Sequence, residues 1–299
     1  MLPTVVCAQF QFTTNNDGSL NIYKYTGSGG VVTIPSTTNG LTVTSIGNSA
    51  FQFASLTSIT IPNSVISLGN YAFYGCGNLT NATIGNSVTN IGISAFRRCN
   101  NLANVTIGNN VTSIGNYAFS YCYSLTSISI PDSVTNIGYQ AFYDCISLIS
   151  VTIPSKVTSI GDGAFEELPF LTSFYIKGNT PSLGGLDVFD GDSKLTVYHL
   201  PGTTGWGKTF GGRPTELWNP QAQTSSASFG VRTNRFGFNI IGSSNLVIVV
   251  EASTDLANPV WSVVGTNTLK TFIGTNGTSY FSDSHWTNYP DRYYRLRSP

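Results

Sequence analysis

Apolar and polar positions alternate in short runs that recur through the middle of the chain. In one run, Ile59 and Ile61 alternate with Ser58 and Thr60, which places apolar side chains on one face of a strand and hydroxyl groups on the other. The pattern predicts six short strands. Their apolar members are Leu56/Ile59/Ile61, Leu79/Ala82/Ile84, Leu102/Val105/Ile107, Leu125/Ile128/Ile130, Leu148/Val151/Ile153 and Leu171/Phe174/Ile176.

A second motif precedes each run and sets the length of a repeat. Versions of Ile-Gly-Asn-Tyr-Ala-Phe recur every 22 or 23 residues and end at Phe51, Phe73, Phe96, Phe119, Phe142 and Phe165. A period of about 20 to 29 residues with this leucine spacing is typical of a leucine-rich repeat. One copy buries too few apolar side chains to offset the entropy lost on ordering it, so neighbouring copies must stack. We therefore predict a mostly β solenoid of 23-residue repeats.

Both ends of the array depart from the repeat and predict caps. Phe10–Phe12 and Leu20–Tyr25 flank the turn signal Asp17-Gly18, which predicts a β-hairpin over the first repeat. At the other end, the last strand pattern is Leu195–Leu200, and the atypical segment Pro201–Trp206 follows it. Atypical terminal copies are expected because the outermost repeat has no neighbour to cover it.

The repeat pattern does not continue beyond residue 218, and five further strand patterns follow, which predict a small β-sandwich. The first residues resemble the tail of an export signal, with small residues at Val6-Cys7-Ala8. We divide the chain into a signal-peptide remnant at 1–8, a solenoid with both caps at 9–218, a linker at 219–228 and a β-sandwich at 229–299.

The repeat resembles the BspA-like leucine-rich repeat of bacterial surface proteins. The resemblance rests on Leu-Thr-Ser-Ile-Thr-Ile-Pro followed by Ser-Val-x-x-(Ile/Leu)-Gly-x-x-Ala-Phe-x-x-Cys, over about residues 31–176. It implies a right-handed solenoid on a secreted or cell-surface protein, in a family associated with adhesion and not known for enzymes. In the last domain, Ser253–Leu256, Trp261 and Tyr293–Leu296 resemble a module on exported proteins of environmental bacteria.

The charge of the chain narrows the classes of partner. Of 299 residues only 9% are charged, and 14 basic residues balance 14 acidic ones. A neutral chain of this kind offers no electrostatic basis for binding nucleic acid or an anionic membrane. It also contains no apolar run of about 18 residues, so we predict no membrane insertion. We expect a secreted or cell-surface protein whose oligomeric state the sequence does not define.

The polar positions of the predicted strands form two columns of uncharged side chains. Such a face can hydrogen-bond a polypeptide or a glycan, and solenoids commonly bind through their sheet. Threonine columns also occur simply because they favour exposed strands, and a regular array resembles an ice-binding surface as well. The candidate ligand-binding residues are Ser58, Thr60, Asn81, Thr83, Asn104, Thr106, Ser127, Ser129, Ser150, Thr152, Ser173 and Tyr175.

The remaining reactive residues favour structural roles. Cys76, Cys99, Cys122 and Cys145 share one repeat position with Ala54 and Leu168, so a buried apolar slot is favoured over a metal site or disulfides. Three acids in Asp187–Asp192 fit a polar turn better than a calcium loop. Arg97-Arg98 is interpreted as a solvated corner. We predict no metal and no cofactor.

No catalytic set is recognisable in the sequence. The two histidines, His199 and His285, lie outside the central repeats, and His285 near Asp283 fits a surface loop pair. We therefore predict a non-enzymatic, extracellular binding or adhesion protein that contacts protein or glycan ligands through the polar sheet. Two alternatives stay open: a self-associating surface scaffold, and a carbohydrate-binding accessory protein that stacks sugars on Trp261 or Trp286.

Overall fold

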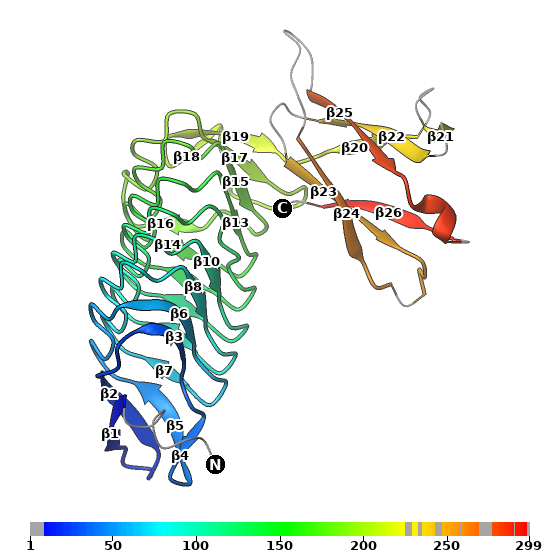
Figure 1. The fold of residues 1–299 in the computed structure, drawn as a ribbon. Helices are drawn as coiled ribbons and strands as arrows, with labels where there is room; N and C mark the ends of the chain where they lie inside the picture. Colours follow the sequence, from blue (N-terminus) through cyan, green and yellow to red (C-terminus); the bar gives the residue numbers. More distant parts are fainter. Residues whose placement is uncertain are drawn as a thin grey trace.

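The computed structural model describes residues 9–224, 229–232, 235–242, 247–257, 259–268, 277–289 and 291–297, so the predicted signal remnant lies outside the described residues. Within these ranges the chain is β structure and turns, apart from one short 3-10 helix, Trp286–Asn288. The described residues contain no helix long and apolar enough to cross a membrane. A long solenoid of stacked turns is followed by a smaller C-terminal module (Figure 1).

The predicted strands stack in parallel along one side of the solenoid, which we call the polar sheet. They form two groups, separated at Ser127–Ile130, where the fourth predicted strand makes only one isolated bridge, between Ser129 and Thr152. The inward side chains Ile128 and Ile130 are nevertheless buried. The first group contains β3 (Gly30–Thr33), β6 (Leu56–Thr60), β8 (Asn81–Thr83) and β10 (Asn104–Thr106); the second contains β13 (Ser150–Ile153), β15 (Ser173–Ile176), β17 (Thr196–His199), β19 (Arg213–Leu217) and β18 (Thr209–Phe210).

A second sheet, continuous from end to end, was not predicted. It begins with the predicted hairpin, in which β1 pairs antiparallel with β2, and then adds one short parallel strand from each turn. Inward residues such as Leu68, Ile91 and Ile114 are buried, and their polar neighbours face outward. The strands are β1 (Phe10–Thr14), β2 (Leu20–Tyr25), β4 (Thr37–Thr38), β5 (Leu41–Ile46), β7 (Ser67–Leu68), β9 (Asn90–Ile91), β11 (Ser113–Ile114), β12 (Asn136–Ile137), β14 (Ser159–Ile160) and β16 (Ser182–Leu183).

The core between the sheets is built from columns of identical residues. The repeat phenylalanines, from Phe51 to Phe165, stack with ring centroids 4.8 to 5.4 Å apart. The four cysteines, Cys76 to Cys145, are fully buried free thiols, and each donates its S–H to a phenylalanine carbonyl of an earlier turn at 3.0 to 3.3 Å. The predicted role of these cysteines as core residues is confirmed.

Close stacking of the turns explains the glycine that lies four residues before each repeat phenylalanine. A Cβ atom added to Gly92 would lie 2.5 Å from the carbonyl oxygen of Gly69 in the preceding turn, and one on Gly69 would lie 2.6 Å from the carbonyl carbon of Gly47. Real Cβ atoms do not approach backbone atoms so closely. Only glycine therefore allows the backbones of neighbouring turns to meet here.

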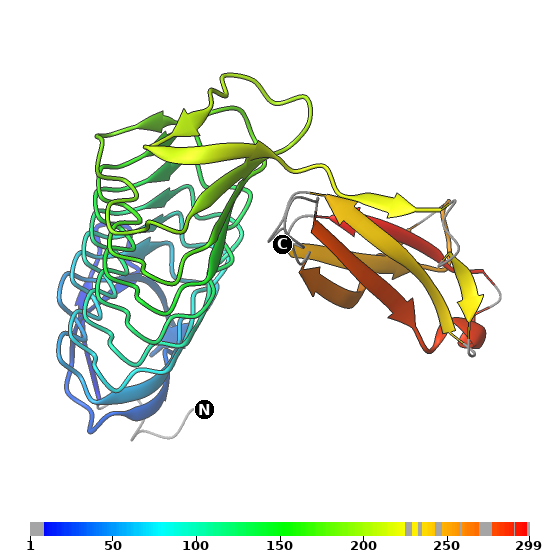
Figure 2. The same ribbon diagram turned by 90° about the horizontal axis from the view of Figure 1, so that it is seen from above.

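The C-terminal module consists of two antiparallel sheets that share the apolar cluster expected of the predicted β-sandwich (Figure 2). Part of the predicted linker is strand, because Gln221–Gln223 pair with β22. Trp218, at the end of the solenoid, belongs to the cluster of the module. One sheet contains β20 (Gln221–Gln223), β21 (Gly230–Arg232), β22 (Arg235–Gly242) and β25 (Gly277–Asp283); the other contains β23 (Val247–Ser253), β24 (Ser262–Thr268) and β26 (Tyr293–Arg297).

Candidate binding surface

The parallel register of the polar sheet aligns the predicted ligand-binding residues into two columns. Thr60, Thr83 and Thr106 are direct partners on successive strands, and Asn81 lies between Ser58 and Asn104 in the neighbouring column. The amide of Asn104 donates from Nδ2 to Oδ1 of Asn81 at 3.0 Å. Each turn therefore presents one residue of each column, at intervals of about 4.8 Å along the solenoid.

The first part of this face is open. Thr60, Thr83 and Thr106 are exposed, as are both asparagines of the neighbouring column, whereas Ser58 is half-buried. Ser127 and Ser129 are also exposed, although they lie outside a regular ladder. These residues carry hydroxyl and amide groups without charge, so they can donate and accept hydrogen bonds.

The last part of the face is covered, which corrects the prediction for two residues. Ser150 and Thr152 are half-buried, and Ser173 and Tyr175 are each only 1% exposed. Tyr175 stacks on Tyr198 with ring centroids 5.3 Å apart, and both rings belong to the apolar cluster of the module. Ser173 and Tyr175 are therefore not available to a ligand.

A cleft of about 340 Å³ marks the boundary between the open and the covered part. Ser127, Ser129, Ser150 and Thr152 line it from the sheet, together with the charged side chains of Asp132, Lys177 and Arg297. Arg297 comes from the module and also forms an ion pair with Glu251 at 2.6 Å. Burial alone would raise the pKa of Glu251, but hydrogen bonds from Arg297 and Arg295 and their charges lower it overall.

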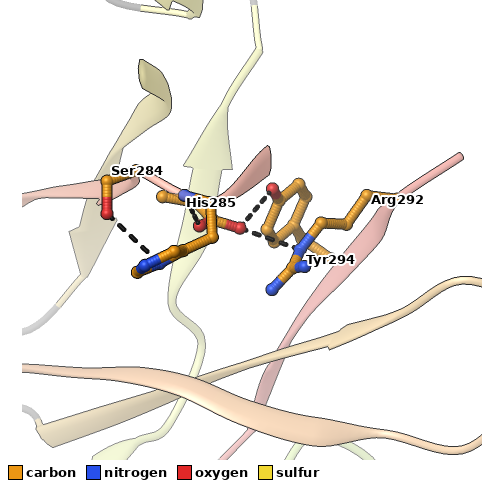
Figure 3. Close-up of polar contacts among 5 residues, drawn as sticks. Ser284, His285, Arg292 and Tyr294 are labelled. Carbon is orange, nitrogen blue, oxygen red and sulfur yellow. Dashed lines mark hydrogen bonds and ion pairs between the residues drawn. The ribbon is translucent and has the colours of Figure 1, made fainter. Parts of the chain in front are cut away.

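The serine, histidine and aspartate that meet in the module do not form a catalytic relay. Ser284 Oγ lies 3.3 Å from His285 Nδ1, but the carboxylate of Asp283 accepts the backbone N–H of His285 and not its ring N–H. Tyr294 and Arg292 converge on the same buried carboxylate, as Figure 3 shows. A relay needs the acid on the imidazole ring, so this cluster orders the loop after β25.

The two tryptophans that would stack on sugars in a carbohydrate-binding protein are partly covered. Trp261 and Trp286 are both half-buried, and the guanidinium of Arg295 lies 4.4 Å from the centroid of the Trp261 ring. One face of Trp261 is therefore already stacked on a side chain of the protein.

His199 stacks on Trp206 within the C-terminal cap, with ring centroids 4.7 Å apart. Among the described residues, no group of three metal-binding side chains is present.

Exposed aromatic residues on the third side of the solenoid were not predicted from the sequence. Phe53 is 66% exposed, and Tyr71 and Tyr139 are also exposed. They lie in the turns that join the second sheet to the polar sheet. Their signal in the sequence is the occurrence of large aromatic residues at repeat positions that flank the buried Ala-Phe pair.

The fold and the polar face together define a leucine-rich-repeat solenoid with an appended β module. The chain belongs to the BspA-type leucine-rich-repeat family: the profile described as "BspA type Leucine rich repeat region (6 copies)" matches residues 21–146 and 112–205. No curated protein matches the sequence.

Two solved bacterial structures are similar. One is the Treponema pallidum leucine-rich repeat protein TpLRR, with 28% identity and a TM-score of 0.48 over 65% of this chain and 85% of that one. The other is a leucine-rich cell surface protein of Faecalibacterium prausnitzii, with 29% identity and a TM-score of 0.45 over 64% of this chain and 69% of that one.

Proposed function

We propose that the chain is an extracellular, non-enzymatic binding or adhesion protein that contacts a protein or glycan ligand through the open part of the polar sheet. One observation carries the proposal: the uncharged side chains from Thr60 to Thr106 stand in register on an exposed face. Membership of the BspA-type family supports a binding scaffold at the bacterial surface.

Binding through such a face sums many weak contacts. A hydrogen bond between neutral groups contributes only about 0.5–1.5 kcal/mol net. Two columns over at least three turns supply six side chains, and further turns extend the same surface. An extended ligand that follows the solenoid axis gains from this spacing, because each turn presents the same pair of groups.

The test compares binding of the protein and two variants to immobilised fibronectin, laminin, collagen and mucin glycans. Thr83→Lys with Thr106→Lys places bulk and charge on the polar sheet. Thr89→Lys with Thr112→Lys makes the matched change on exposed threonines beside the second sheet. We expect the first variant to lose binding to the panel member that the parent recognises, and the second to keep it.

Equal binding by both variants and the parent would place the ligand site elsewhere, with the C-terminal module first. A parent that binds no panel member would favour the alternative of a self-associating scaffold.

A further inference from the structure

A separate surface lies on the third side of the solenoid, which we call the turn face. It is formed by the outward residues of successive turns, with Arg97 and Arg98 in one turn, Tyr121 in the next, Tyr143 in the next, and Glu166 and Glu167 in the turn after that. It shares no residue with the polar sheet. Arg98, Tyr121, Asp144 and Glu167 occupy the same repeat position, so they form one column.

The backbone of this column is strained. Arg98, Tyr121, Asp144 and Glu167 all have left-handed φ angles, between 57° and 62°. Glycine adopts this conformation without steric cost, and the chain uses Gly75 and Gly191 at the same position in other turns. The same conformation recurs at Phe53, so it belongs to the turn and places the side chains of this column outward, one above another along the face.

The turn face separates charge along the solenoid axis. The guanidinium of Arg97 lies 4.7 Å from the ring centroid of Tyr117 and that of Arg98 lies 5.7 Å from Tyr121, so both arginines are held against rings. Tyr121 in turn contacts Tyr143 at 5.3 Å. In the described part of the chain, neither arginine forms an ion pair.

Negative charge accumulates at the other end of the same face. Burial raises the pKa of Glu166, the hydrogen bond from Gln140 opposes the shift, and the charges of Asp187, Asp190 and Glu167 add to it. Burial together with the charge of Glu167 raises the pKa of Asp144. No ion pair to these acids is present among the described residues. The face therefore carries two unneutralised patches of opposite sign, three turns apart, with tyrosines between them.

We propose that a second copy of this chain docks antiparallel on the turn face, so that Arg98 of each copy meets Glu167 of the other. A two-fold axis between the turns of Tyr121 and Tyr143 brings these rings together at the centre and places both charge pairs symmetrically around them. A two-fold interface requires a self-complementary surface. The arginine and the glutamate at the two ends of the column Arg98, Tyr121, Asp144 and Glu167 meet that condition, and Tyr143 lies beside Asp144 near the centre. Tyrosine and arginine are also among the residues enriched at energetically important contacts.

The size of the face sets the strength of the dimer. With turns spaced about 4.8 Å apart, the distance along the solenoid from the arginines to the glutamates is roughly 15 Å. The whole turn face, over every turn with a left-handed residue at this repeat position, is roughly 30 Å long. Such a surface lies at the small end of specific protein interfaces. The dimer is therefore weak, depends on protein concentration, and leaves both polar sheets uncovered.

The test measures the mass of the full chain by sedimentation velocity over about a hundredfold range of protein concentration, because mass action populates a weak dimer at high concentration. Low salt is used because salt screens the charge pairs. The variants are Arg98→Glu and Glu167→Arg. Both substitutions fit the fold, because each introduces a residue that the chain already holds at this repeat position and φ angle. Lys156→Glu reverses an exposed charge away from the turn face and serves as the control.

We expect the parent and Lys156→Glu to dimerise at high concentration, and Arg98→Glu and Glu167→Arg each to remain monomeric. An equal mixture of the two variants restores the dimer, because the glutamate introduced in one variant then meets the arginine introduced in the other. The unchanged Arg98 and Glu167 pair at the second contact. A parent that stays monomeric overturns the proposal, as does dimerisation of either single variant to the same extent as the parent, or a mixture that stays monomeric.

Discussion

At the scale of single residues, Asp192 shows how the end of the array alters a core position. It occupies the slot that Cys76 to Cys145 and Leu168 fill in the earlier turns. Its side chain is 1% exposed, and Oδ1 accepts the backbone N–H of Leu168 at 2.6 Å. Burial raises the pKa of Asp192 to about 8, although the hydrogen bond from Leu168 and the charge of Arg213 oppose the shift. The carboxyl group is thus protonated at neutral pH.

This shift predicts that the solenoid loses stability as pH rises. Between the ordinary pKa of 3.8 and the folded value of about 8, the folded state holds a proton that the unfolded state releases. The free energy of unfolding should therefore fall with rising pH in that window, by at most about 1.4 kcal/mol per pH unit from this group. Denaturant titrations at several pH values measure the slope.

Asp192→Asn keeps an oxygen acceptor for Leu168 and removes the titration. We expect its unfolding free energy to change less with pH than that of the parent over the same window. Asp132→Asn, at an exposed loop position, is the control and should keep the slope of the parent. A slope that Asp192→Asn leaves unchanged would contradict the protonated state of this carboxyl group.

At the scale of elements, the stacking of turns depends on backbone contact at glycine. Gly92→Ala should destabilise the protein by about 1–3 kcal/mol, the range for forced overpacking, because its Cβ would lie 2.5 Å from the carbonyl oxygen of Gly69. Gly77→Ala is the matched control, since a Cβ there meets nothing within 4 Å. Equilibrium unfolding in urea compares the two; equal stability of both variants would show that the turns can separate without loss.

The alternation of residues predicted the inward and outward sides of the strands but not the pairing of all of them. The polar sheet follows from Leu-x-x-apolar-x-apolar because each strand is long enough to alternate. The second sheet uses two-residue strands such as Ser67–Leu68, which are too short for a recognisable period. At Ser127–Ile130 the two isoleucines point inward as predicted, but the backbone does not pair as a regular strand. Pairing depends on the spacing of neighbouring turns, and the alternation of side chains does not encode that spacing.

At the scale of the whole molecule, the C-terminal module decides how much of the polar sheet is available. The columns give the same local pattern of alternating polar and apolar residues at Ser127 and at Ser173, so the sequence predicted one uniform face. The cover over the last strands comes from residues such as Trp218 and Phe238, far along the chain. In this column, serine and threonine give way to the large aromatic residues Tyr175 and Tyr198. That change was the available signal that this part of the face packs against another element.

Tyr175 should therefore behave as a core residue. Tyr175→Ala should lower the free energy of unfolding by about 3 kcal/mol, as expected when a buried aromatic side chain is truncated. Tyr71→Ala, at a ring that is 42% exposed, should cost less than about 1 kcal/mol. Chemical denaturation followed by tryptophan fluorescence provides both values. A small effect at Tyr175 would mean that the module does not cover this part of the sheet in solution.

The interruption of the polar sheet at Ser127–Ile130 has a mechanical consequence. A ligand held by β6, β8 and β10 pulls on one block of the solenoid, while the C-terminal module is joined to the other block. Tension between them cannot pass through the interrupted ladder. It is transmitted instead by the second sheet, which continues through β11 and β12, and by the phenylalanine stack from Phe119 to Phe142. Backbone hydrogen bonds between the turns, such as that from Tyr121 N–H to the carbonyl oxygen of Tyr143 at 2.9 Å, share the load. The parts of the solenoid away from the proposed contact surface therefore bear the force.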